Sequence, residues 1–104
     1  MTIEHIIQAL DARIINIEDP NREISTGYCG DFLSNVISKA PENSVWFTVM
    51  NNQNVAAVQT LADIALTVIC EGVEPDETLA KRVKERGLNM IVTDLSVYEA
   101  VKKV

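Results

Sequence analysis

One local pattern occurs three times in this chain of 104 residues. A short apolar run ends in a small polar loop that carries Gly or Asn, and the loop leads directly into a segment with helical spacing of apolar residues. Because the carboxyl ends of parallel strands meet at one edge of a sheet, loops of this kind collect where ligands usually bind in α/β proteins. The pattern therefore predicts a parallel sheet, with a candidate site formed by the three loops 26–31, 48–54 and 70–76.

The rest of the chain extends this alternation of strands and helices. Near the N-terminus, Ile3, Ile6, Ile7 and Leu10 share one face of a predicted helix. Short loops and alternating elements favour a single α/β domain over residues 1–104, with a mainly parallel sheet of about four to five strands flanked by helices. The expected elements are helix 2–10, strands 13–17 and 23–26, helix 31–39, strand 44–50, helix 54–61, strand 65–70, a helix from about 75 to 86, strand 89–93 and a closing helix to residue 104.

Composition narrows the function classes. The chain is 47% hydrophobic but only 5% aromatic, so its core consists mainly of Ile, Val, Leu and Ala. A net charge of −6 argues against binding to nucleic acid or to an anionic membrane surface. No apolar run approaches the length of a membrane span, and the N-terminus lacks the features of a signal peptide. We therefore expect a cytoplasmic protein with reduced thiols.

Catalytic and metal-binding patterns are weak. His5 is the only histidine, so a nucleophile activated by histidine would have to use it. Cys29 precedes a predicted helix start, which could lower its pKa, and a disulfide to Cys70 requires the two loops to meet. We predict no enzyme activity and no cofactor, and keep a small hydrolase or transferase that uses Cys29 or Asp31 as a remote alternative.

Acidic residues in and near the loops suit magnesium or calcium, but acids around a first helical turn are also normal for helix stability. We therefore predict no metal site. The residues weighed for this role are Asp31, Asp63, Glu71, Glu74 and Asp76.

Ligand binding through the loops is the stronger hypothesis. Loop 26–31 offers backbone N–H groups to an anion, although it matches neither a Walker loop nor a dinucleotide-binding fingerprint. The run 51–54 offers neutral amides to a nucleobase or a ribose; alternatively it is a turn with Asn54 as a helix cap. The candidate ligand residues are Thr26, Gly27, Gly30, Asp31, Thr48, Asn51, Asn52, Gln53, Asn54, Glu71 and Gly72.

The region 45–104 resembles the DRTGG domain. The matching features are a strand that leads into the polar loop at Asn54, an apolar strand that ends at Gly72, the segment 74–80, the segment 85–88, and a last strand that ends at Thr93. Residues 26–34 also look like the corresponding stretch of small stand-alone DRTGG-like proteins, so the resemblance covers most of the chain. It implies a fold related to the N-terminal domain of HPr kinase/phosphorylase.

The resemblance also implies an accessory or regulatory module. Where the family has Asp-Arg-Thr this chain has the amides of 51–54, and where the family has Thr-Gly-Gly it has Cys70-Glu71-Gly72. The basic residue that would pair with a phosphate is therefore absent, and an acid stands beside the one retained glycine.

Two functional hypotheses follow from the residues and the resemblance together. The first is a non-catalytic regulatory module that acts through a protein partner or as a homodimer. Its expected surface includes Tyr28, Phe32 and the aliphatic faces of the first and last helices; Trp46 is either part of this surface or part of the core. The second hypothesis is a domain that senses a small ligand, a nucleotide or a related metabolite, at the three loops.

Overall fold

The computed structural model describes all 104 residues and contains one five-stranded sheet. The strand order is β1-β5-β4-β3-β2, with β1 antiparallel to β5 and all other neighbours parallel. The elements are α1 (Ile3–Leu10), β1 (Arg13–Asn16), β2 (Gly27–Cys29), α2 (Leu33–Lys39), β3 (Val45–Thr48), α3 (Asn54–Leu61), β4 (Leu66–Ile69), α4 (Glu77–Arg86), β5 (Met90–Val92) and α5 (Val97–Lys103).

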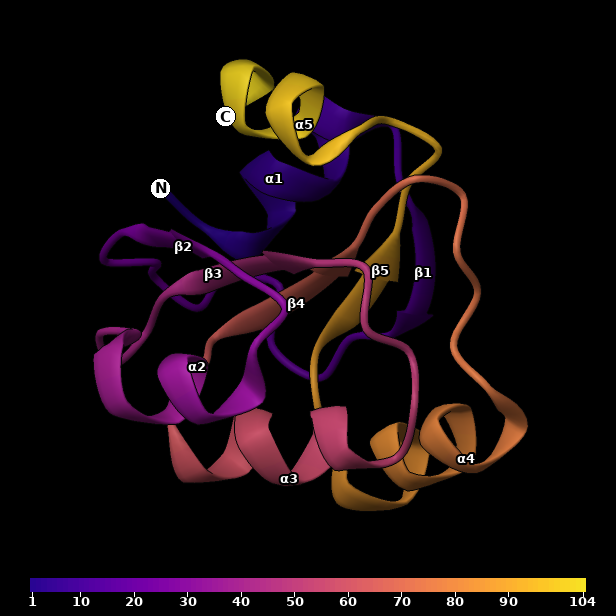
Figure 1. Cartoon of the computed structure of the whole chain (residues 1–104). Coiled ribbons are helices and arrows are strands. Elements are labelled where there is room, and N and C mark those ends of the chain that lie inside the picture. The colour runs from indigo at the N-terminus through magenta and orange to yellow at the C-terminus, as the bar shows by residue number, and fades with distance from the viewer.

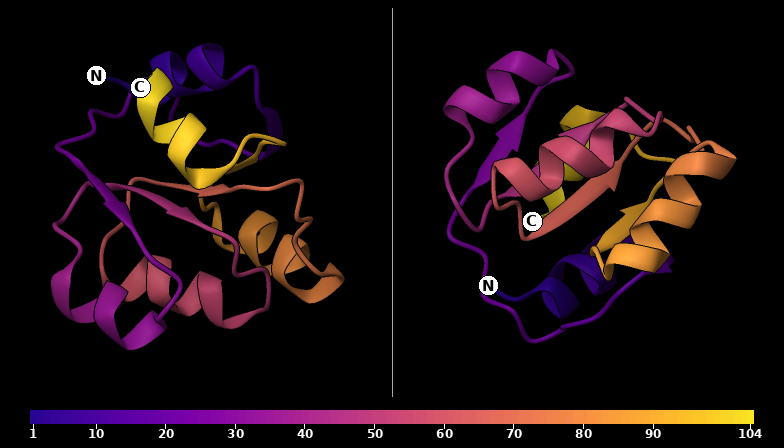
Figure 2. Two further views of the ribbon diagram at one scale, coloured as in Figure 1. Left: turned by 45° about the horizontal axis from the view of Figure 1, so that its top comes forward. Right: turned by 90° about the horizontal axis from the view of Figure 1, so that it is seen from below.

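The sheet is the middle of three layers. Helices α1 and α5 cover one face, and α2, α3 and α4 lie side by side on the other (Figures 1 and 2). Strands β3, β4 and β5 are buried along their whole length, which explains why their sequences are continuous apolar runs. Side chains alternate between the faces: Phe47 packs toward α1 and α5, and Trp46 packs toward α2–α4. The predicted fold class is confirmed.

The first strand pair differs from the expectation. The predicted strand 23–26 is wrong, because strand β2 comprises Gly27–Cys29, which were assigned to a loop. Strand β1 runs antiparallel to β5, and its register shifts between Ile14 and Asn16. Helix α2 begins at Leu33 rather than at Asp31. Short segments that contain Gly carry little periodic signal, so their pairing depends on neighbours that a local pattern does not reveal.

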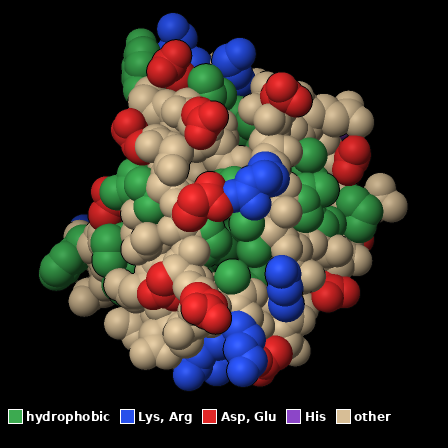
Figure 3. Space-filling view, turned by 90° about the vertical axis from the view of Figure 1, so that its right-hand side faces the viewer, with side chains coloured by type: hydrophobic (Ala, Val, Ile, Leu, Met, Phe, Trp, Pro, Cys, Tyr) green, Lys and Arg blue, Asp and Glu red, His purple; other side chains and the backbone are tan.

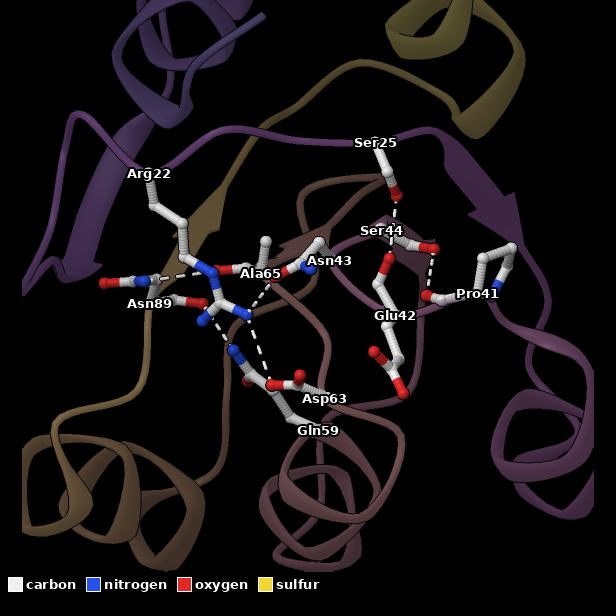
Figure 4. A network of polar contacts seen from close by, with 10 residues as sticks. All are labelled: Arg22, Ser25, Pro41, Glu42, Asn43, Ser44, Gln59, Asp63, Ala65 and Asn89. Atoms are coloured by element: carbon white, nitrogen blue, oxygen red, sulfur yellow. Dashed lines mark hydrogen bonds and ion pairs between the residues drawn. The ribbon is translucent and has the colours of Figure 1, made fainter.

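A connecting strap, residues 17–26, crosses the amino ends of the parallel strands and joins β1 at one edge of the sheet to β2 at the other. Figure 4 shows Arg22 at its centre, where Nη2 donates to Asn43 Oδ1 at 2.7 Å and to Asp63 Oδ1 at 3.2 Å. Asn43 lies just before β3 and Asp63 just before β4. Ser25 also bonds to this edge, because its backbone N–H donates to Asn43 O at 2.9 Å.

Asn89 holds the first part of the strap. Its Oδ1 accepts from the Glu18 backbone N–H at 2.8 Å, and its Nδ2 donates to Ala65 O at 3.1 Å. The Asn89 carbonyl also accepts from Gln59 Nε2 at 2.8 Å. Since Asn89 is 5% exposed, water cannot readily replace these partners.

Asn89→Ala is expected to lower the free energy of unfolding by about 2–3 kcal/mol, because it removes the bond to the Glu18 backbone N–H and leaves the buried carbonyl of Ala65 without a partner. Urea unfolding followed by circular dichroism measures the change. The matched control is Asn35→Ala on the exposed surface of α2, which is expected to change stability by less than about 0.5 kcal/mol. Equal losses in both variants would contradict this role of Asn89.

Candidate functional site

The carboxyl ends of β2, β3, β4 and β5 lie at one edge of the sheet, and the polar loops that follow them bond to one another. Asp31 is the first link: its Oδ1 accepts from Thr48 Oγ1 at 2.7 Å and from the Val49 backbone N–H at 2.9 Å. The cap of α2 is Phe32, and it makes no side-chain hydrogen bond. The prediction that this helix begins at Asp31 is therefore wrong. The carboxylate of Asp31 instead joins the loop after β2 to the loop after β3.

Asn51 is the second link. Its Nδ2 donates to Glu74 O at 2.9 Å, and its carbonyl accepts from the Asp76 backbone N–H at 2.9 Å. Together these bonds join the loop after β3 to the loop after β4. The amides at this edge therefore serve first to hold the loops in place.

The other amides of the run have separate positions. Asn52 Oδ1 accepts from the Asn54 backbone N–H at 2.9 Å, which closes the turn that opens α3. The helix cap is Gln53, which makes no capping bond through its side chain. The alternative in which Asn54 caps the helix is wrong, because Asn54 is its first residue. The side chains of Gln53 and Asn54 are exposed.

Other predicted residues lie apart. Thr26 and Gly27 are at the amino end of β2, where the Thr26 carbonyl accepts from Val45 N at 2.9 Å, so they do not join the carboxyl edge. Gly30 is at that edge, and its carbonyl accepts from Trp46 Nε1 at 2.8 Å.

Glu71 and Gly72 continue the carboxyl edge after β4, with φ values of +66° and +72°. Their backbone N–H groups donate to Leu95 O at 2.8 Å and Thr93 O at 3.1 Å, so they are not available to an anion. A side chain at position 72 would meet both the unfavourable φ and Asp94 Oδ1, 3.3 Å from the added Cβ.

The edge is acidic. Its exposed carboxylates include Asp31, Glu71, Asp76 and Asp94, and the neighbouring cation, Arg13, is ion-paired with Glu74. Figure 3 views this side and shows acidic side chains spread across it, with Lys and Arg at the top, at the centre and in the lower part of the view. No three His, Cys, Asp or Glu side chains come together in a way that could hold a metal ion. The field at this edge disfavours phosphate.

The candidate nucleophiles are poorly activated. Partial burial and the nearby Asp31 carboxylate raise the pKa of Cys29, so the expected lowering is wrong. Burial, with smaller effects of Cys29 and Glu71, raises the pKa of Cys70 to about 12. Both thiols are free. His5 lies on α1, where its Nδ1 accepts from Thr2 N at 3.2 Å in a capping box. None of these groups forms a nucleophile–base pair.

An apolar groove of about 510 Å³ opens on the α1/α5 face beside β2, and sequence analysis did not predict it. Its wall is formed by the two ends of the chain together with residues of β2 and β3. Because these residues are far apart in the sequence, no local sequence pattern predicts the groove. The alternative that Trp46 belongs to an interaction surface is wrong, because Trp46 is fully buried, whereas Phe32 is 66% exposed. The groove is lined by Met1, Ile24, Ser25, Thr26, Gly27, Cys29, Val45, Phe47, Val101 and Val104.

The comparisons with known proteins bear on the fold. No family model and no curated protein matches the sequence. Among solved structures, the chain is similar to the CBS and DRTGG domains of the regulatory region of Clostridium perfringens pyrophosphatase, crystallised with its activator, diadenosine tetraphosphate. The TM-score is 0.76 at 15% identity, over 98% of this chain and 45% of that one. The chain therefore has a CBS/DRTGG-like α/β fold and spans less than half the length of this neighbour. In addition, none of its helices is long and apolar enough to cross a membrane.

The raised pKa of Cys70 predicts a pH dependence of stability. The native state keeps a proton that the unfolded thiol releases near its ordinary pKa of about 8.5. The free energy of unfolding should therefore fall as pH rises from about 8.5 toward 12, and Cys70→Ala should flatten this decline. Urea unfolding at several pH values between about 8 and 10 measures it, with Asn35→Ala on the exposed surface of α2 as the control. Parallel curves for the wild type and Cys70→Ala would contradict the prediction.

Proposed function

We propose that this chain is a non-catalytic regulatory module that acts by self-association or by binding a protein partner, in the cytoplasm. The observation that carries the proposal is that two surfaces of the domain differ in chemistry and in how far their groups are already bonded. At the carboxyl edge Asp31 and Asn51 are bonded to neighbouring loops, and the exposed charged side chains include the carboxylates of Glu71, Asp76 and Asp94. Beside β2, by contrast, an apolar groove remains open to solvent.

The carboxyl edge supports a non-catalytic role. A reaction site needs a nucleophile, a general base or a bound ion placed for chemistry. Here the carboxylate of Asp31 holds two loops together, the pKa values of both thiols are raised, and the only imidazole caps a helix.

The groove supports an interaction role. Met1 and Val101, which line it, are 52% and 39% exposed, and Phe32 just beyond β2 is 66% exposed. An exposed apolar groove is a common mark of a surface that binds another protein. Of the residues expected at a dimer surface, Tyr28 and Phe32 lie in or next to β2, and Val101 supplies part of α5.

The proposal predicts that the purified protein is a dimer at micromolar concentration. Burial of the groove should more than offset the repulsion between two chains of net charge −6, and the dimer should tighten as salt screens that repulsion. Sedimentation velocity at several protein and salt concentrations measures this. A monomer under all these conditions would sink the self-association proposal.

A second candidate is a domain that senses a small nucleotide ligand. The observation that favours it is the shared fold with a regulatory region that was crystallised with diadenosine tetraphosphate. In this chain the acidic carboxyl edge opposes a polyphosphate, so recognition would depend on neutral groups such as Asn52 and the backbone near Gly30.

A thermal-shift series separates the two candidates. If the first holds, adenine nucleotides, diadenosine tetraphosphate and acyl phosphates leave the melting temperature unchanged within about 1 °C, because no cation at the carboxyl edge is free to receive a phosphate. A rise in melting temperature that is lost in Asn52→Ala or Gly30→Ala, and kept in the control Asn35→Ala, would instead establish the sensor.

A further inference from the structure

The two edges of the sheet differ in how they are protected. Strand β1 carries a charged residue, Arg13, that is ion-paired with Glu74, and its register shifts between Ile14 and Asn16. Charges and irregular register are the usual devices that stop an edge strand from pairing with another chain. Strand β2 has neither device: Gly27–Cys29 pairs regularly with β3 and includes no charge and no proline.

The backbone of β2 has unused hydrogen-bonding groups on its outer side. The Thr26 carbonyl and the Gly30 N–H bond to β3, and Tyr28 lies between them in the same register. Because successive residues of a strand direct their backbone groups to opposite sides, the N–H and C=O groups of Gly27 and Cys29 point away from the sheet. Neither N–H takes part in the loop, turn or side-chain hydrogen bonds of the chain.

Charge also favours this edge as a contact between like copies. Residues 24–30 are uncharged, although the chain as a whole has a net charge of −6. Of the two flanking carboxylates, Glu23 is ion-paired with the N-terminal ammonium at 3.1 Å. Asp31 keeps its charge, but its Oδ1 accepts hydrogen bonds from Thr48 and Val49 of the same chain. Two copies can therefore approach through the uncharged residues 24–30.

We propose that β2 of one copy pairs antiparallel with β2 of a second copy about a twofold axis at Tyr28, joining the two sheets. This interface rests on the proposed self-association and names its surface. In this register Gly27 of each copy exchanges an N–H and a C=O with Cys29 of the other, so the same two residues satisfy both sides of an isologous contact. The apolar grooves of the two copies then lie on the same face of the joined sheet, and their burial adds to the backbone bonds.

Substitutions at the outer side of β2 test this pairing. Cys29→Lys places a charge on the edge, and Gly27→Pro removes an outward N–H without touching a bond to β3. A side chain at position 27 fits, since the nearest atom to its Cβ is Val45 Cγ1 at 3.6 Å. Leu61→Lys is the matched control, because Leu61 is 71% exposed on α3. Sedimentation equilibrium of all four proteins measures the dimer dissociation constant, and urea unfolding verifies that each variant is folded.

The expected result is a dissociation constant at least about tenfold higher in both edge variants and unchanged in Leu61→Lys. A short bismaleimide should also join the two exposed Cys29 thiols of a dimer, and this product should disappear in Cys29→Ser. A wild-type dimer that persists in both edge variants would overturn the β2 interface and leave self-association standing. A wild-type monomer would overturn both.

Discussion

The fold depends on one short segment, the strap 17–26, which crosses the sheet at the end where the parallel strands begin. Strand β1 lies at one edge and β2 at the other, so the chain must cross the amino ends of β5, β4 and β3 between them. Arg22 of the strap makes this crossing specific, because it bonds to Asn43 before β3 and to Asp63 before β4. Asn89, just before β5, accepts from the Glu18 backbone N–H at the start of the strap. The strap is also hydrogen-bonded to the start of α1. The Ile3 N–H donates to Arg22 O at 3.1 Å, and the Ile24 N–H donates to Met1 O at 2.8 Å. One segment therefore sets the position of both outer strands and of the first helix.

The parts of the fold that sequence analysis predicts are those in which burial alone determines structure. Strands β3, β4 and β5 are buried on both faces, so their apolar runs identify them, and the helices between them show regular apolar spacing or clear end signals such as Gly87. The direction of β1 and the limits of β2 depend on partners far along the chain. Polar residues stand before each central strand, at Asn43, Asp63 and Asn89, but only the structure shows that Arg22 and the strap bind them.

The candidate site illustrates the same limit. The sequence places the loops at one edge of the sheet, because that follows from parallel strands. It does not show whether a polar side chain faces a ligand or another loop, and here Asp31 and Asn51 face other loops. The pKa of Cys29 is hard to predict for a related reason: the sequence shows a helix start nearby, but only the structure shows the partial burial and the neighbouring Asp31 that raise this pKa. The DRTGG resemblance anticipated the fold that the solved neighbour shares, although it named no residue of the groove.

The two ends of the chain meet at the wall of the groove, where Met1 and Val104 both belong to its lining (Figure 1). Anything attached covalently to either end, including an affinity tag, therefore leaves the domain at this opening. A bulky fusion at either terminus is therefore expected to hinder the binding of another molecule in the groove. The same geometry matters if the domain is inserted into another protein. Its two linkers would then leave the domain close together, beside strand β2.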